Sequence, residues 1–203
     1  MDRIKLKQEA KEFINGKKLA IWEPILLLAI GSGIILGFLG AIFGEESTMY
    51  SLLSSLVSLA LIPAEFGLMR YELNLVRGKE YKIDMLWEEY KNKDNIPKYI
   101  ICTLLVGLCV AVGMVLLVVP GVIMGLSLNF YMEMMIDNEK LNQSNILHEC
   151  KEMMNGHKKD LFILGLSFIG NILLGVITLG IYFIWLIPYI QTTMIKYYDS
   201  IKK

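Results

Sequence analysis

Five polar side chains interrupt long apolar stretches of the sequence, and they are the residues whose placement could support chemistry: Glu23, Glu65, Asn129, Glu133 and Gln191. Glu65 comes five residues before Arg70 and Glu23 comes five residues after Lys18, so helices would place both carboxylates about 7–8 Å inside apolar segments. Carboxylates inside a membrane are energetically costly and are candidates for binding a proton or a ligand. Alternatively, Glu65 pairs with Arg70 or Lys18 and Glu23 extends to the membrane surface, which would be a structural role.

Three prolines also lie inside or near the apolar stretches: Pro63, Pro120 and Pro188. Proline within a helix removes one backbone hydrogen bond and favours a kink. In a membrane the freed carbonyl needs a partner, so Pro63 and Pro188 should face protein or a water-filled crevice. Near Pro120 the chain can turn in two ways. In the first, the turn lies near Gly113, and Pro120 then kinks the following helix. In the second, Pro120 and Gly121 form the turn themselves.

The elements that must position these residues are apolar helices. The chain has 203 residues, of which 55% are hydrophobic, and its 20 basic residues balance its 20 acidic residues. Apolar stretches cover most of residues 19–69, 99–136 and 161–195. About 20 apolar residues are enough for one helical membrane crossing, so each stretch accommodates two. The sequence predicts an all-α membrane protein with six transmembrane helices arranged as three hairpins.

The basic residues predict how the helices are oriented. All 20 Lys and Arg side chains lie in residues 1–18, 70–98, 137–160 and 196–203, and the turns between paired helices contain none. Because Lys and Arg are enriched in cytoplasmic loops, these four segments and both termini should lie in the cytoplasm. We expect one polytopic domain in the cytoplasmic membrane.

Short amphipathic segments come before the apolar stretches. Residues 11–21, KEFINGKKLAI, resemble residues 151–163, KEMMNGHKKDLFI, and residues 87–100 are a looser third copy. Apolar side chains recur there at helical spacing beside lysines, which predicts helices lying flat on the cytoplasmic membrane surface. The recurrence indicates either a threefold structural repeat or chance similarity among amphipathic loops.

Signals for catalysis and cofactor binding are missing from the sequence. It contains no phosphate-binding glycine loop and no nucleophile or metalloprotease motif. The cysteines Cys102, Cys109 and Cys150 have no metal-ligand spacing with the two histidines. We therefore expect no enzyme activity, no cofactor, no metal and no nucleic-acid partner.

The chain carries a family resemblance that is most specific in its C-terminal third. The features there are Met154-Asn155-Gly156, Phe162, Ser167-Phe168-Ile169, Thr178-Leu179-Gly180-Ile181, Pro188-Tyr189 and Tyr197. Earlier in the chain, the matching features are VVPGVIMG at residues 118–125 and the loop LVRGKEYKIDMLWEEY at residues 75–90. They resemble the bacterial integral-membrane family catalogued as domain of unknown function 975, and the likeness extends over essentially the whole chain. The resemblance implies six spans in a bacterial cytoplasmic membrane and no assigned activity. Asn171 departs from the family pattern, where a bulky aromatic residue is expected.

Two functions are consistent with these observations. The first is a non-enzymatic membrane component that interacts with lipids, with a membrane-protein partner or with a second copy of itself. The alternative is a small transporter or channel that uses the polar layer around Glu23 and Glu65. A water-filled cavity reaching Glu65 would favour transport, whereas a direct ion pair in a closed bundle would favour the structural role.

Overall fold

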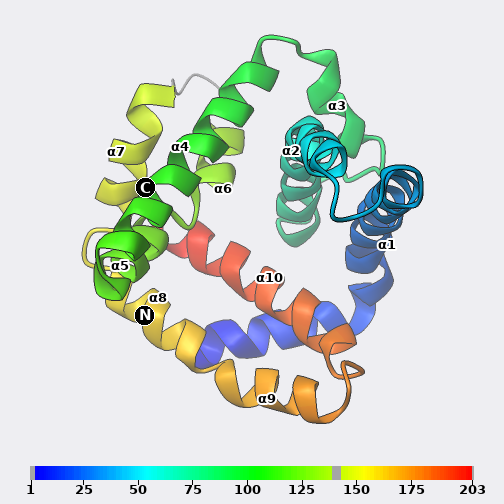
Figure 1. Ribbon diagram of the computed structural model, residues 1–203. Helices are drawn as coiled ribbons and strands as arrows, with labels where there is room; N and C mark the ends of the chain where they lie inside the picture. The colour runs from blue at the N-terminus through cyan, green and yellow to red at the C-terminus, as the bar shows by residue number, and fades with distance from the viewer. Residues whose placement is uncertain (1–2, 139–142, 203) are drawn as a thin grey trace.

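The computed structural model describes residues 3–138 and 143–202, and throughout these ranges the regular secondary structure is helical, without strands (Figure 1). The prediction of an all-α protein is confirmed for this part of the chain. Its helices are α1 (Arg3–Phe43), α2 (Thr48–Val76), α3 (Met85–Lys91), α4 (Asn95–Leu116), α5 (Val118–Leu128), α6 (Tyr131–Asp137), α7 (Gln143–Met153), α8 (Lys158–Leu166), α9 (Ile169–Ile177) and α10 (Phe183–Ile201). Residues 139–142 of the loop predicted at 137–160 lie outside the described residues.

Helix α1 has two parts that meet at Lys17, whose φ of −129° and ψ of 16° are not helical. The break falls at the expected boundary between the basic arm and the first apolar stretch, and the two parts run in different directions (Figure 1). In the arm, Leu6, Ala10 and Ile14 are buried. Their spacing of four residues forms one helix face, which packs on the rest of the protein and is not left free to cover a membrane surface.

Helix α2 continues past the boundary expected at residue 69 and ends at Val76. Pro63 lies buried inside it, as Pro188 does inside α10, so both prolines have the protein-facing position that a proline in a membrane helix needs. Gly67 allows α3 to pack closely against α2. A Cβ atom at Gly67 would lie 2.6 Å from the carbonyl oxygen of Leu86, which is closer than atoms can approach.

The turn between α4 and α5 lies at Leu117, between the two positions that the sequence suggested. Leu117 is extended, with φ −165° and ψ 145°. Gly113 and Gly121 let the two helices approach, since a Cβ atom on Gly113 would lie 2.9 Å from the Cα atom of Gly121. The expectation of a kink at Pro120 is corrected here. Pro120 lies in the first turn of α5, where backbone N–H groups have no partner within the helix and proline is tolerated.

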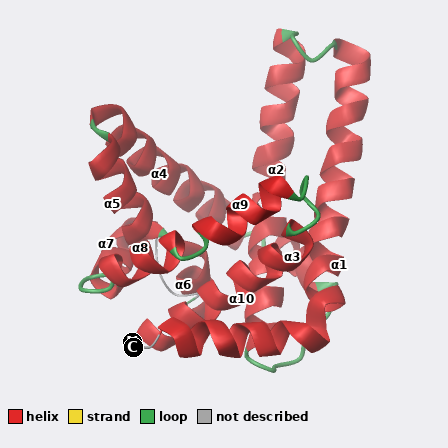
Figure 2. Ribbon diagram, turned by 90° about the horizontal axis from the view of Figure 1, so that it is seen from below, coloured by secondary structure: helices red, strands yellow, loops and turns green. Residues whose placement is uncertain are grey.

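Five helical segments among the described residues are long and apolar enough to cross a membrane: Arg3–Phe43, Thr48–Val76, Asn95–Leu116, Val118–Asp137 and Lys158–Ile177. The last of them is interrupted between α8 and α9 at Ser167 and Phe168. Helix α10 returns after a turn at Leu179 and Gly180, both of which have positive φ. Figure 2 shows the α1–α2 and α4–α5 pairs extending away from the part of the molecule that holds α10 and the arm of α1.

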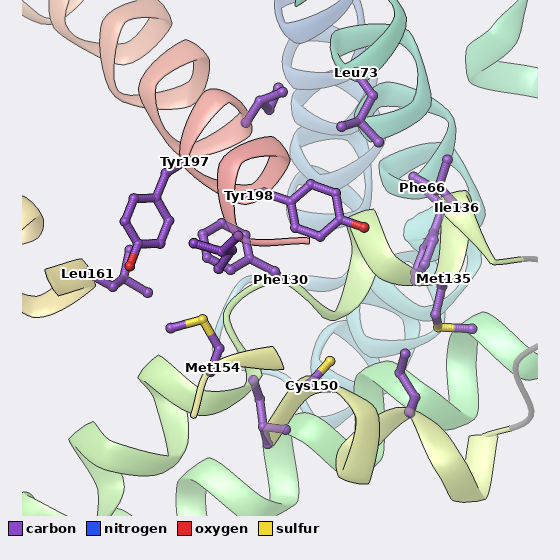
Figure 3. Close-up of a cluster of buried hydrophobic side chains, with 14 of the residues drawn as sticks. Phe66, Leu73, Phe130, Met135, Ile136, Cys150, Met154, Leu161, Tyr197 and Tyr198 are labelled. Carbon is purple, nitrogen blue, oxygen red and sulfur yellow. The ribbon is translucent and has the colours of Figure 1, made fainter. Parts of the chain in front are cut away.

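The buried core gathers at one end of these helices. Figure 3 shows Phe130 beside Tyr197 and Tyr198, with ring centroids 5.9 and 5.6 Å apart, and Cys150 and Met154 nearby. Ile146, Cys150 and Met154 put the apolar stripe of the α7 segment into this core, so that segment, like the arm, packs on protein. The outer parts of the apolar helices are exposed instead, as Ile34 at 67% and Val115 at 87% illustrate. Apolar surface of this extent is typical of helices that lipid covers.

Candidate functional site

The structure distributes the five predicted polar residues over different environments. The side chains of Glu23, Glu65 and Asn129 are exposed, Glu133 is buried, and Gln191 is half-buried. Within the described ranges, no hydrogen bond or ion pair joins any two of them. They do not form a connected polar layer. Two cations were considered as partners of Glu65, and within the described ranges no ion pair joins Glu65 to Arg70 or Lys18; Arg70 pairs with Glu89 of α3.

The most extensive polar cluster lies where α2, α6 and α10 end, and Arg77 is at its centre. Arg77 caps the C-terminus of α2 and donates to both oxygens of Asp137, from Nη1 at 2.6 Å and from Nη2 at 2.8 Å. It also donates to Asp199 of α10, with Nη2 2.7 Å from Oδ1. Lys202 completes the cluster at 3.1 Å from Asp137 and 2.6 Å from Asp199. One guanidinium thus ties together three helix ends that are far apart in the sequence.

The protonation equilibria in this cluster follow from burial and pairing. Burial disfavours the charge on Arg77, but the hydrogen bonds to Asp137 and Asp199 outweigh it and raise the pKa of Arg77. Burial likewise opposes ionisation of Asp199, yet hydrogen bonds from Arg77 and Lys202 hold the pKa of that carboxyl below its usual value. Tyr198 donates to Asp137 at 3.1 Å, and burial together with that carboxylate raises the pKa of Tyr198. At neutral pH Arg77 is therefore positively charged, Asp199 negatively charged and Tyr198 neutral.

A cavity of about 950 Å³ opens beside this cluster. Its lining includes basic side chains from Arg77, Lys79, His157 and Lys202, and acidic side chains from Asp137, Glu149, Glu152 and Asp199. Arg77 and Lys202 balance the charges of Asp137 and Asp199, so the cavity has mixed charge and no strong preference for an anion or a cation. Its lining offers polar docking contacts and does not pair a nucleophile with a general base.

A second buried network joins α2, α3 and α4. Arg70 Nε donates to Glu89 Oε1 at 2.6 Å, and the hydroxyl of Tyr99 donates to Glu89 Oε2 at 2.7 Å. The Tyr99 ring stacks on Phe66 with centroids 3.9 Å apart. Both oxygens of Glu89 are thus satisfied, which is the condition for burying a carboxylate. This network is a structural device that holds α3 against α2 and α4.

Glu72 and Gln191 differ from these satisfied groups. Glu72 of α2 is 4% exposed, and its Oε1 has no hydrogen-bond partner. Gln191 Oε1 of α10 is also buried without a partner, and the two residues line the same small cavity. Sequence reasoning singled out Gln191 but not Glu72, because residues beyond Arg70 were assigned to a loop. The sequence feature that could have placed Glu72 in the helix is the run from Tyr71 to Val76, which has no glycine or proline to end the helix.

Metal binding has no support in the part of the chain that the structure describes. No group of three or more His, Cys, Asp or Glu side chains there could hold a metal ion. Cys102, Cys109 and Cys150 are free thiols.

The fold and these clusters define a helical protein whose long apolar segments are suited to a membrane and whose polar contacts gather at one end. The family described as "Protein of unknown function (DUF975)" matches residues 108–203, which confirms the resemblance to this family for that part of the chain. No curated protein and no solved structure matches the chain. The matched range contains α5 to α10, including Asp137, Gln191 and Asp199, whereas Glu72 and Arg77 lie before it.

Proposed function

We propose that the protein is a multi-pass component of a bacterial cytoplasmic membrane, with six crossings, both termini in the cytoplasm and a non-enzymatic role. Its apolar helix surfaces contact lipid, and its cytoplasmic end offers the mixed-charge cavity beside Arg77 to a membrane-protein partner. We assign the sixth crossing to α10 together with the residues that lead into it from the turn at Leu179 and Gly180.

The observation that carries this proposal is the pattern of ion pairs between segments. The four basic segments predicted to be cytoplasmic are joined to one another by Arg3–Asp160, Arg77–Asp137, Arg77–Asp199, Lys202–Asp137 and Lys196–Glu9. Segments in direct contact lie on the same side of a membrane. An even number of crossings must therefore separate each segment from the next, which supports paired crossings and cytoplasmic ends.

The alternative role as a transporter or channel depends on Glu23 and Glu65. It requires both carboxylates to share a water-accessible pathway, whereas neither of them lines the cavity beside Arg77 or the small cavity beside Glu72. Their position away from these two cavities favours the first role. In sealed vesicles, ion flux that the variant Glu65→Gln abolishes would support the alternative.

Membrane-impermeant maleimide labelling of intact cells tests the topology. Single cysteines are introduced as Glu45→Cys and Lys91→Cys in a background where Cys102, Cys109 and Cys150 are replaced by serine. Cysteine at position 45 should react in intact cells, whereas cysteine at position 91 should react only after the membrane is permeabilised. Labelling of position 91 from outside, or equal labelling of both positions in intact cells, would contradict the proposed arrangement.

A further inference from the structure

The small cavity between α1, α2 and α10 brings together two buried acceptor atoms that have no hydrogen-bond partner. It is lined by Glu72 of α2, by Gln191 and Thr192 of α10, and by apolar side chains that include Ile21 of α1. Glu72 Oε1 and Gln191 Oε1 are both buried and unpartnered. The space available to the centre of a water-sized sphere is about 10 Å³, which accommodates about one water molecule.

The charge state of Glu72 decides whether this arrangement is stable. A buried carboxylate needs a cation or several hydrogen-bond donors, because the protein interior solvates charge far less well than water. Among the described residues, no Lys, Arg or His forms an ion pair with Glu72. A carboxylic acid avoids this cost and can itself donate a hydrogen bond to a neighbouring acceptor.

The groups around the cavity also favour a neutral Glu72. Glu133 of α6 is a second buried carboxyl group, and it acts electrostatically on Glu72. Arg77 and Asp137 act in turn on Glu133, and Tyr71 is the titratable neighbour of Glu72 on its own helix. The cavity-lining side chains from α1 and α10 do not ionise. A charge on Glu133 would repel a charge on Glu72, so a neutral Glu72 also avoids this repulsion.

A proton fits the cavity better than a metal cation does. Sodium or calcium needs about six oxygen ligands, whereas the unpartnered acceptors here are two and the space is that of one water. We propose that Glu72 is a proton-binding site in which its protonated oxygen donates to Gln191 Oε1, directly or through one water molecule. The proton comes from bulk water, and no other bond forms or breaks. This inference goes beyond the proposed membrane role and holds whichever partner the protein has.

The first test compares thermal unfolding of the detergent-solubilised full chain, wild type and Glu72→Gln, between about pH 5 and about pH 9. The folded protein retains a proton that the unfolded chain releases, so wild-type stability should fall as the pH rises. The unfolding equilibrium constant should increase by up to about tenfold per pH unit in this range. Glu72→Gln is neutral and can donate its amide to Gln191, so it should reduce this dependence to the part that the second buried carboxyl group, Glu133, contributes, without lowering stability at acidic pH. Glu46→Gln, in the exposed turn between α1 and α2, is the matched control and should leave the dependence in place.

Infrared spectroscopy of the wild-type protein gives a second readout that does not require the variant to fold. With isotope-labelled glutamate, a protonated carboxyl band should be present at neutral pH and disappear at alkaline pH. Gln191→Leu, which removes the acceptor, should shift that disappearance to lower pH. The proposal is overturned if wild-type stability is flat and Glu72→Gln lowers it at every pH, or if the neutral-pH spectrum has no protonated glutamate band.

Discussion

Replacing Arg77 should disconnect three helix ends, because this side chain bonds to Asp137 and Asp199 at the same time. Removing one partner of a fully buried ion pair costs about 3–5 kcal/mol. The two aspartates are 25% and 27% exposed, and Lys202 still contacts both after Arg77 is removed. We therefore expect Arg77→Ala to lower the free energy of unfolding by about 2–3 kcal/mol. Arg77→Lys keeps the charge but loses the forked geometry, and should cost about 1–2 kcal/mol.

The assay is denaturant unfolding of the purified protein in detergent, followed by tryptophan fluorescence. Lys82→Ala is a suitable control, because the Lys82–Glu80 pair is as short, at 2.7 Å, but lies in solvent and should contribute nothing measurable. If Arg77→Ala unfolds at the same denaturant concentration as Lys82→Ala, the cluster does not hold the helix ends together.

The same cluster predicts an acid limb in the stability profile. The pKa of Asp199 is lower in the folded protein than in the unfolded chain, so the unfolded chain binds a proton first as the pH falls. The contribution of ionised Asp199 to the free energy of unfolding is complete above about pH 4, the ordinary pKa of an aspartate in an unfolded chain. This contribution is lost as the pH falls through the lower pKa that Asp199 has in the folded protein. Arg77→Ala should make the profile flatter in this acidic range. A profile that keeps its full acid limb in this variant would show that the limb has another origin.

Two further predictions concern packing and thiol reactivity. Gly67→Ala should destabilise the protein by about 1–3 kcal/mol, because the new Cβ atom would overlap the backbone of α3. Gly107→Ala is the control, because its new Cβ atom meets open space, and it should be close to neutral in the same unfolding assay. Equal destabilisation by the two substitutions would refute the close contact between α2 and α3. Burial raises the pKa of Cys150 to about 12, so its thiol should resist iodoacetamide at about pH 8 until the protein unfolds. Mass spectrometry measures this, and equal rates in the folded and unfolded protein would contradict the buried position.

Local sequence properties were sufficient to predict the helices and their apolar stretches. A run of apolar residues specifies a helix that lipid or protein can cover, whatever its tertiary neighbours are. The break at Lys17 falls at the boundary expected between the basic arm and the first apolar stretch, and the amphipathic segment around Trp87 forms the short helix α3. Asn171 lies in α9, where the sequence suggested a span, although that span is divided at Ser167 and Phe168.

The candidate site depended on contacts that sequence spacing does not encode. Glu65 and Glu72 lie on the same helix, seven residues apart, yet Glu65 is exposed while Glu72 is buried beside Gln191. Arg77 and Asp199 are 122 positions apart and form one ion pair. The amphipathic stripes of the arm and of α7 were expected to lie on the membrane surface, whereas in the structure their apolar side chains pack on protein.

The sequence by itself therefore determined the helical class, the apolar segments and the segregation of the basic residues, because hydrophobicity and charge are properties of each segment. Only the tertiary structure decided which carboxylates are paired, which are exposed and which one is buried without a partner. The physical reason is that solvation and pairing of a charge depend on groups brought close by folding, and these groups come from distant parts of the chain.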